Sequence, residues 1–312
     1  MKNNRILLSI CIPTYNRCVK LSNALAAWKQ AIEFYGGNDV ELIVSDNCSS
    51  DDTASVLSQF EMIPNFRHYR NSDNLGFNRN MFHLVDEYAK GEFCWIIGDD
   101  DFVDTNCLIT LLDVLKDNVD YVSLNFRKYS DLNKYNRSRN IHNNKSIFRN
   151  VTFYESIDKN ASLNNILATL MTTSVFRREP FVKCKRDGIM ADSRANYMST
   201  FPNSFLMLKL FHDSICGCIK SPIFSIIDEK KEWSENGDLY FKNHLFQLYS
   251  FYCSVLGDKV MEESNNGKWM RRLKAKYIVR DELLKGHINF KTIIAFKDLL
   301  LCPSLYIHAL LR

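Results

Sequence analysis

The stretch Phe93-Cys94-Trp95-Ile96-Ile97-Gly98-Asp99-Asp100-Asp101 joins an apolar run to three consecutive carboxylates. An apolar run of this length beside a glycine is typical of a buried strand. A strand that ends there places the three acids at a sheet edge, which is where open α/β folds bind ligands. A hard divalent cation such as Mg²⁺ would neutralise the three anions and keep positions open for substrate phosphates. A solvated acidic turn that caps the next helix is the alternative.

The first 125 residues alternate strand and helix patterns joined by short connections. Apolar runs bounded by turn residues predict strands at 6–12, 40–45, 66–69, 93–97 and 119–124. Apolar residues at helical spacing predict helices at 21–35, 51–57, 77–88 and 106–116. Strands that alternate with helices imply an α/β fold, with a mostly parallel central sheet and helices on both sides.

The remainder of the chain is less regular. Residues 126–150 are rich in Asn, Arg, Lys and Ser and are predicted to form a polar excursion between two halves of the protein. Cys216 and Cys218 alternate along an apolar run, so they are expected on one face of a strand, and no second pair completes a zinc site. Beyond residue 151 the pattern predicts helices near 162–170, 203–212, 238–256, 268–285 and 290–300, and strands at 173–176 and 222–227.

Composition limits the class of protein. With 46% hydrophobic and 12% aromatic residues among 312, the chain can bury a large core and is globular rather than disordered. Its ten cysteines are scattered and no secretory signal precedes them, so they are expected to be reduced thiols in the cytosol. No run reaches the roughly 18 apolar residues of a transmembrane helix.

Charge is distributed unevenly along the chain. Residues 259–312 hold 11 Lys and Arg against 5 Asp and Glu, a net charge of +6, which leaves −2 for the rest of a chain whose net charge is +4. A basic tail that also carries aromatic residues predicts contact with an anionic membrane surface, to which each well-placed cation contributes about 1 kcal/mol. An ordinary solvated helix face is the alternative. Nucleic acid is a weaker candidate, because no known binding motif accompanies the charge.

Three loops follow strands that are expected to be parallel neighbours, at 13–17, 46–50 and 99–101. They would emerge at one edge of the sheet. The first loop offers Tyr15 as a surface on which a base can stack. The second offers Asp46, whose carboxylate can accept a hydrogen bond from a base N–H or amino group. The third offers the metal site.

A fourth loop at 72–80 completes the set. It places Gly76 where the backbone must pass close to a ligand. Arg79 lies early in the following helix, where it can reach a diphosphate or the acids. A base-binding Asp, a carboxylate triplet and an Arg together fit a nucleoside diphosphate with one divalent ion.

The four loops carry four sequence motifs, which are Ser9-Ile10-Cys11-Ile12-Pro13-Thr14-Tyr15-Asn16-Arg17, Val44-Ser45-Asp46-Asn47-Cys48-Ser49-Ser50-Asp51, Asn74-Leu75-Gly76 and Asp99-Asp100-Asp101. In this order and spacing, they resemble the motifs of the family 2 glycosyltransferases of the GT-A fold. The forms at 74–80 and 95–101 look most like the abequosyltransferase branch that builds bacterial O-antigen, as does the ending Leu301-Cys302-Pro303-Ser304-Leu305-Tyr306.

The resemblance implies roles for residues in the four motifs. Asp99 and Asp100 would hold the ribose and the diphosphate-bound metal. Asp101 would complete the metal site or face the sugar, which makes it a catalytic candidate. The metal, Mg²⁺ or Mn²⁺, would neutralise the charge that develops on the leaving nucleoside diphosphate. The remaining donor-binding residues implied by the resemblance are Pro13, Tyr15, Asn16, Asp46, Asn74, Gly76 and Arg79.

The general base is the point at which this sequence departs from the family. Inverting members usually carry a Glu-Asp pair or a similar acid about a hundred residues after the metal motif, and the matching region, 188–203, contains no such pair. Asp192 is the nearest carboxylate and Asp187 is the second choice. A base must lie within about 3 Å of the acceptor hydroxyl, directly or through a water. The alternative for Asp192 is an ordinary loop residue. The absence of a Glu-Asp pair also leaves the stereochemistry open, because a retaining mechanism needs no such base.

These features predict a metal-dependent glycosyltransferase. It would move a sugar, with CDP-abequose or a related CDP-deoxyhexose as the specific donor, to a polyprenyl-diphosphate-linked oligosaccharide at the cytosolic face of the plasma membrane. Residues 1–125 would bind the nucleotide sugar and 126–230 the acceptor, with 231–312 as a helical, basic extension at the membrane surface. Two alternatives stay open: a non-catalytic nucleotide-sugar or glycan-binding module of the same fold, and a nucleotidyltransferase.

Overall fold

The structure is a computed structural model that describes residues 5–129, 146–161, 165–185, 189, 195–227 and 238–284. Contacts divide the chain into two compact units. The first consists of residues 1–160 and 168–248, and the second of 161–167 and 249–312. No helix among the described residues combines the length and the apolar character needed to cross a bilayer.

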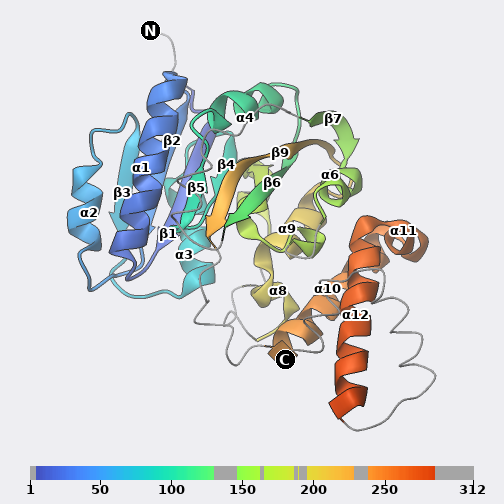
Figure 1. Ribbon diagram of the computed structural model, residues 1–312. Coiled ribbons are helices and arrows are strands. Elements are labelled where there is room, and N and C mark those ends of the chain that lie inside the picture. The colour runs from blue at the N-terminus through green and yellow to red at the C-terminus, as the bar shows by residue number, and fades with distance from the viewer. Residues whose placement is uncertain are drawn as a thin grey trace. The chain divides into compact units, whose positions relative to one another are not determined.

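The described strands of the first unit form one nine-stranded sheet in the order β3-β2-β1-β4-β8-β6-β9-β5, with β7 paired to β9 (Figure 1). The four strands β3, β2, β1 and β4 are mutually parallel. β8 then runs antiparallel to both β4 and β6, and β9 runs parallel to β6 and antiparallel to β5 and β7. The strand bounds are β1 Leu8–Thr14, β2 Val40–Asp46, β3 Phe66–Arg70, β4 Phe93–Ile96, β5 Asp101–Val103, β6 Tyr121–Tyr129, β7 Ile147–Thr152, β8 Ser174–Arg177 and β9 Ile215–Ile227.

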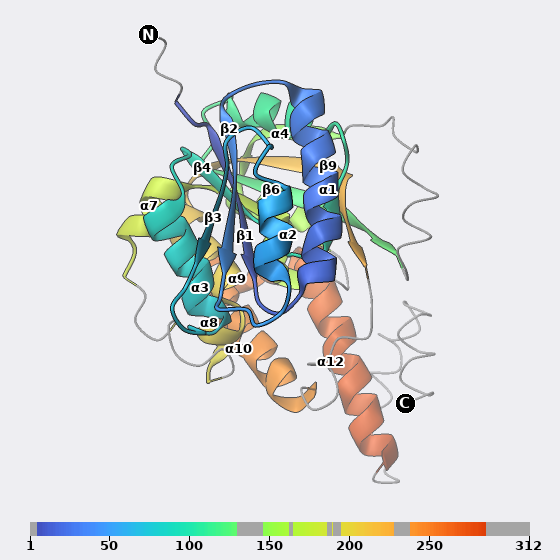
Figure 2. The same cartoon turned by 90° about the vertical axis from the view of Figure 1, so that its left-hand side faces the viewer.

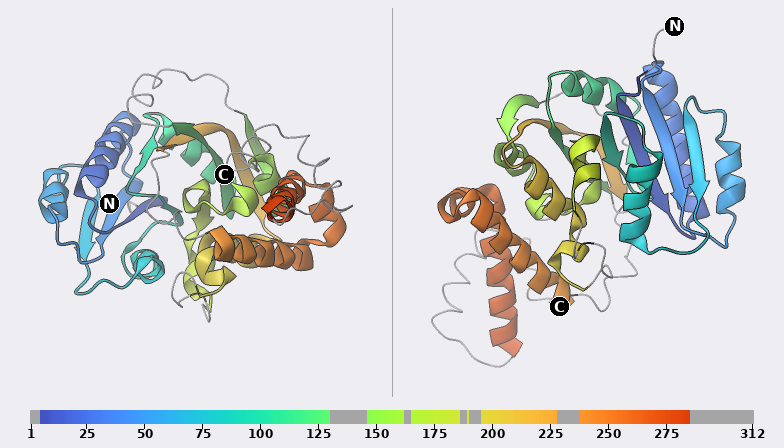
Figure 3. Two further views of the ribbon diagram at one scale, coloured as in Figure 1. Left: turned by 60° about the horizontal axis from the view of Figure 1, so that its bottom comes forward. Right: turned by 180° about the vertical axis from the view of Figure 1, so that it is seen from behind.

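Helices cover both faces of this sheet. α1, α2 and α4 lie on one face, and α3 and α7 lie on the other (Figures 2 and 3). The helix bounds in the first unit are α1 Cys18–Tyr35, α2 Thr53–Gln59, α3 Phe77–His83, α4 Cys107–Leu115, α6 Phe153–Lys159, α7 Arg178–Lys183, α8 Tyr197–Thr200 and α9 Pro202–Phe211. α10, Asp238–Leu256, contains the boundary between the units after Leu248, and α11 Asp258–Glu263 and α12 Asn265–Leu284 belong to the second unit.

Three of the four parallel strands, β1, β2 and β4, are buried along their whole length, which explains why their sequences are rich in apolar residues. Every residue of β1 and β2 is buried. The main core lies between the sheet and α1, where the Trp28 ring packs edge-on against that of Trp95 in β4, with centroids 5.4 Å apart. α1 ends where the sequence predicts, at Gly36, whose φ of +68° is left-handed.

Several sequence expectations need correction. The helix predicted at 77–88 is α3 followed by a π-helical turn, Leu84–Tyr88. The polar segment predicted between the two halves, 126–150, is wrong at both ends, because β6 extends to Tyr129 and β7 begins at Ile147. Residues 130–145 between these strands lie outside the described residues. The helix expected at 162–170 is only a short 3-10 turn, Ile166–Ala168, among its described residues. The helix expected at 290–300 lies outside the described residues.

The cysteines of the described residues lie both in the core and nearer the surface. Nine of them are free thiols, and no disulfide joins them. Cys216 and Cys218 lie on β9, where they are paired in register with Tyr121 and Ser123 of β6, and both are fully buried. Burial raises the pKa of each of these two thiols to about 12.

Candidate functional site at the carboxyl edge of β1, β2 and β4

The carboxyl ends of three neighbouring parallel strands meet at one edge of the sheet, as the sequence predicts. Thr14 at the end of β1 is in register with Asp46 at the end of β2. On the other side of β1, Cys11 is in register with Ile96 of β4, and the chain continues from there to the carboxylate triplet. The loops at 13–17, 46–50 and 99–101 therefore lie together.

Asp99 connects the triplet to the first loop. Its side chain is almost fully buried, and both of its oxygens have partners. Thr14 Oγ1 donates to Asp99 Oδ2 at 2.7 Å, and Arg17 Nη1 donates to Asp99 Oδ1 at 2.6 Å. Burial raises the pKa of Asp99 above its usual value, while the Arg17 charge and the Thr14 hydrogen bond act in the opposite direction.

Asp100 is the most accessible member of the triplet, with 36% of its side chain exposed. Its Oδ2 lies 3.2 Å from Arg17 Nη1 and 3.9 Å from Lys20 Nζ. Both cations come from the start of α1, and they are placed to balance the negative charge of Asp99 and Asp100.

Asp101 points to a different part of the sheet. It is buried, begins β5, and accepts hydrogen bonds on Oδ2 from Thr172 Oγ1 at 2.6 Å and from the Gly98 amide at 3.2 Å. Thr172 is fixed in turn, because its carbonyl accepts from Trp95 Nε1 of β4 at 2.8 Å. A side chain at Gly98 would collide with the triplet, since a Cβ there would lie 2.9 Å from Asp101 Oδ2.

The chemistry of the triplet fits a divalent cation only in part. No group of three or more Cys, His, Asp or Glu side chains among the described residues is arranged to hold a metal ion. Mg²⁺, however, is commonly held by one or two carboxylates and completes its shell with water and substrate phosphates. Asp100, with its exposed carboxylate, fits that mode of binding, provided that further donor oxygens come from a substrate.

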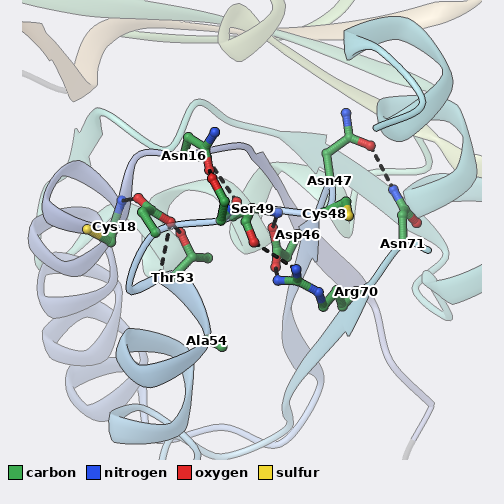
Figure 4. A network of polar contacts seen from close by, with 12 residues as sticks. Asn16, Cys18, Asp46, Asn47, Cys48, Ser49, Thr53, Ala54, Arg70 and Asn71 are labelled. Atoms are coloured by element: carbon green, nitrogen blue, oxygen red, sulfur yellow. Dashed lines mark hydrogen bonds and ion pairs between the residues drawn. The ribbon is translucent and has the colours of Figure 1, made fainter. Parts of the chain in front are cut away.

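The second loop is held by an ion pair. Arg70, at the end of β3, donates from Nη1 to Asp46 Oδ2 at 2.6 Å and from Nη2 to the Ser49 carbonyl at 2.7 Å (Figure 4). The other oxygen of Asp46 accepts from the Ser49 amide at 2.8 Å. The buried Asp46 carboxylate is thus fixed in orientation by its own chain before any ligand binds.

The first and second loops are hydrogen-bonded to one another (Figure 4). The backbone N–H of Asn16 donates to Ser49 Oγ at 2.9 Å, and the side-chain Oδ1 of Asn16 accepts from the backbone N–H of Ser50 at 2.7 Å. Asn16 has a left-handed φ of 52°, which turns the chain between β1 and α1. Of the two other residues predicted in the first loop, Pro13 is buried within β1, whereas Tyr15 is 43% exposed and available for stacking.

A chain of asparagine amides fixes the fourth loop to the second. Asn47 Nδ2 donates to Asn74 Oδ1 at 2.8 Å, and Asn47 Oδ1 accepts from Asn71 Nδ2 at 3.0 Å. Gly76 then adopts a left-handed φ of 77° just before α3, a conformation that favours glycine. Arg79 lies on α3 and is exposed.

The structure therefore brings most of the predicted donor-binding residues to one edge of the sheet. The two candidate bases, Asp192 and Asp187, lie outside the described residues. Sequence reasoning assigned no role to four residues that hold the acids in place. Arg17 stands in the same motif as Tyr15, and Arg70 directly follows a predicted strand, so both carried a signal; the remaining two are Thr14 and Thr172.

Comparison with known proteins shows which proteins this chain is similar to. Residues 9–184 match the family model described as glycosyl transferase family 2. The chain is 31% identical over 218 residues, 68% of its length, to the abequosyltransferase RfbV of Salmonella typhimurium. It is 36% identical over 107 residues, 34% of its length, to the GalNAc(5)-diNAcBac-PP-undecaprenol beta-1,3-glucosyltransferase of Campylobacter jejuni. The matched regions span 63% and 33% of the length of these two relatives.

Solved structures show the same fold. TarS residues 1–349 from S. aureus superimposes with a TM-score of 0.60 at 14% identity, covering 94% of this chain and 80% of that one. The mannosyltransferase PcManGT from Pyrobaculum calidifontis, solved with GDP-Man and Mn²⁺, gives a TM-score of 0.56 at 13% identity, covering 98% of this chain and 83% of that one. The predicted GT-A fold is confirmed.

Proposed function

Because the chain belongs to glycosyltransferase family 2, we propose that it transfers a sugar from a nucleoside diphosphate sugar to a hydroxyl of a lipid-linked oligosaccharide in O-antigen synthesis. The observation that carries the proposal is the direct hydrogen bond between Thr14 and Asp99. It joins the loop proposed to hold the base to the triplet proposed to hold the diphosphate, so one ligand can span both.

The proposed donor site extends along this sheet edge. Tyr15 would stack on the base, and the fixed Asp46 carboxylate would accept from its N–H or amino group through a lone pair that the chain's own donors leave unused. Asn74 and Gly76 would form the wall of the site beside the donor. Arg79, exposed on α3, would reach the diphosphate.

The reaction balances as a displacement at the anomeric carbon. The acceptor oxygen forms the new bond to that carbon, the bond from the carbon to the β-phosphate oxygen breaks, and the nucleoside diphosphate departs with the electron pair. The proton of the acceptor hydroxyl would pass to a base, for which Asp192 is the first candidate and Asp187 the second. Asp101, held by Thr172, would face the transferred sugar.

A divalent ion, Mg²⁺ or Mn²⁺, would supply positive charge to the departing diphosphate. Asp100 is the carboxylate best placed to hold it, with Asp99 and Asp101 as the other members of the proposed metal set. Removing charge stabilisation of this kind from an active site typically lowers kcat by about 10²- to 10³-fold.

The specific donor and acceptor are proposed from the relatives. RfbV is named as an abequosyltransferase and the Campylobacter relative as acting on an undecaprenol-linked glycan. We therefore propose CDP-abequose or a related CDP-deoxyhexose as the donor and a polyprenyl-diphosphate oligosaccharide as the acceptor. The basic C-terminal extension would place the enzyme at the membrane that holds this acceptor.

The test is a donor panel assayed with the full chain. CDP-, UDP- and GDP-sugars are offered with Mn²⁺ or with EDTA, and nucleoside diphosphate release and product mass are measured. We expect release from one donor class, lost with EDTA and reduced at least a hundredfold in Asp100→Asn. A parallel assay offers a nucleoside triphosphate with a sugar 1-phosphate, and release of pyrophosphate there would indicate a nucleotidyltransferase. Donor binding without any release, with acceptor present, would indicate a binding module.

A further inference from the structure

Arg17 contacts two of the carboxylates proposed to hold the metal ion. It precedes the first turn of α1, and its Nη1 lies 2.6 Å from Asp99 Oδ1 and 3.2 Å from Asp100 Oδ2. One guanidinium therefore bridges two adjacent carboxylates. Its side chain is 43% exposed, so the same group also borders solvent from which a ligand arrives.

The two carboxylates differ in how much they depend on Arg17. Asp99 is buried and accepts a second hydrogen bond from Thr14, so the Arg17–Asp99 pair belongs to the folded structure. Asp100 is more exposed and the Arg17 contact to it is longer. Exposed ion pairs are weak and exchange readily. The contact with Asp100 can therefore be given up while the contact with Asp99 stays.

A cation at Asp100 and the Arg17 guanidinium would repel each other. Both compete for the same carboxylate oxygens, and like charges a few ångströms apart disfavour joint occupancy. A diphosphate changes this balance, because its oxygens accept hydrogen bonds from a guanidinium and also coordinate a divalent ion.

We propose that Arg17 is a built-in counter-ion that makes metal binding conditional on the nucleoside diphosphate. Without donor, Arg17 neutralises Asp99 and Asp100 and the site holds a divalent ion weakly. With donor, the diphosphate draws Arg17 away from Asp100, which then coordinates the ion. The inference rests on the proposed function, in that a metal and a nucleoside diphosphate share this site. Linkage then requires each ligand to strengthen binding of the other by the same factor.

The test measures Mn²⁺ binding directly, by the electron paramagnetic resonance signal of free Mn²⁺, with the full chain and with or without CDP or UDP. Wild type is expected to bind Mn²⁺ at least tenfold more tightly when the nucleotide is present. Arg17→Gln keeps a donor for Asp99 but removes the charge. It should bind Mn²⁺ alone about tenfold more tightly than wild type, and the gain from nucleotide should shrink by a similar factor.

Two further variants keep the test decisive if Arg17→Gln folds poorly. Lys20→Gln removes the more distant cation, 3.9 Å from Asp100, without touching Asp99, and should raise Mn²⁺ affinity about two- to threefold. Arg17→Lys keeps the charge, so its affinity for Mn²⁺ alone should stay near that of wild type. Thermal melts of each variant show whether the fold is kept.

The proposal is overturned if Arg17→Gln and Lys20→Gln bind Mn²⁺ alone no better than wild type. It is also overturned if no variant binds Mn²⁺ even with nucleotide. These results are distinguishable from failure of the proposed function. If the protein still releases nucleoside diphosphate from a sugar donor in EDTA, it is a glycosyltransferase whose activity does not depend on a divalent ion, and only the proposal for Arg17 fails.

Discussion

At the scale of single residues, the acids of the site are held by neighbours that come from distant parts of the chain. Asp101 depends on Thr172, which follows it by 71 positions, and Asp46 depends on Arg70. A buried carboxylate costs free energy unless donors satisfy it. These donors therefore decide where each carboxylate points before substrate arrives.

Thr172→Val tests this dependence because it keeps the shape of the side chain and removes the hydroxyl that donates to Asp101. We expect kcat to fall about tenfold with little change in the KM for donor, and stability to fall by about 1–2 kcal/mol, because a buried acceptor loses a donor. Thr172→Ser restores the hydroxyl and should restore kcat. Steady-state kinetics of the purified variants measure the split between kcat and KM.

Thr110→Val is the matched control. Thr110 on α4 is also buried, but its Oγ1 has no hydrogen-bond partner within the described structure. The same substitution there should leave activity unchanged and leave stability equal to or higher than that of wild type. Equal loss of kcat in both variants would mean that Thr172 acts only through packing.

At the scale of elements, the sequence was informative where local pattern decides structure. The apolar runs of β1, β2 and β4 and the intervening helices predict parallel neighbours, and from these follows the meeting of three loops at one edge. β5 was missed because it has only three residues, begins with an acid, and gains its partner, β9, from more than 100 residues later. The contacts of Thr172 and Arg70 depend on such tertiary pairing, so no local pattern shows them.

The turn between β4 and β5 gives a prediction for Gly98. In Gly98→Ala the new Cβ would lie 2.9 Å from Asp101 Oδ2 and 3.1 Å from Asp100 Oδ1, so the triplet must shift. We expect at least a tenfold loss of transfer activity while the protein stays folded. Gly36→Ala at the end of α1 is the control, because its φ of +68° makes alanine cost about 1 kcal/mol of stability without touching the site. Activity assays and thermal melts should show lost activity with a kept fold in Gly98→Ala, and kept activity with lower stability in Gly36→Ala.

Asp51 links the first turns of two helices and makes their stability depend on pH. It accepts from the Cys18 amide of α1 and the Thr53 amide of α2. Burial acts to raise its pKa, but hydrogen bonds from Thr53 and Cys18 outweigh burial and lower the pKa to about 2. Since the unfolded value is about 3.9, its contribution is present above that pH and is lost as pH falls through about 2.

Denaturant unfolding of wild type and Asp51→Ala between pH 2 and 6 measures this contribution. The stability difference between the two should be constant above about pH 5 and should narrow between pH 4 and 2. Asp51→Asn keeps an acceptor oxygen at every pH, so its stability relative to Asp51→Ala should not change over the same range. A constant difference between wild type and Asp51→Ala would show that the Asp51 charge plays no part.

At the scale of the whole molecule, the charge asymmetry predicts binding to anionic membranes. Lys268, Arg271 and Lys274 are exposed on α12 at a spacing of three residues, so they share one side of the helix. Reversing all three to Glu should weaken binding to phosphatidylglycerol vesicles at least tenfold, since each cation contributes about 1 kcal/mol. Co-sedimentation at low and high salt gives the measurement.

A control with the same change in net charge separates the location of the charge from its amount. Lys116, Lys128 and Lys209 are exposed in the first unit, and their reversal to Glu should leave vesicle binding much less affected. If both triple variants lose vesicle binding equally, binding depends on the net charge of the protein and not on the position of the charges on α12. If neither does, the extension is an ordinary solvated surface.

The pairing of β5 with β9 also bears on how the protein is made. Asp101, Phe102 and Val103 pair with Ile226, Ser225 and Phe224, so the strand that begins with a site carboxylate waits for a partner until translation has passed residue 226. A nascent chain on the ribosome has the residues of β1, β2, β3 and β4 early, yet Asp101 stays in a strand without its β9 partner throughout that interval. Chains truncated before residue 224 should therefore be inactive, and they should expose an unpaired sheet edge to which chaperones can bind.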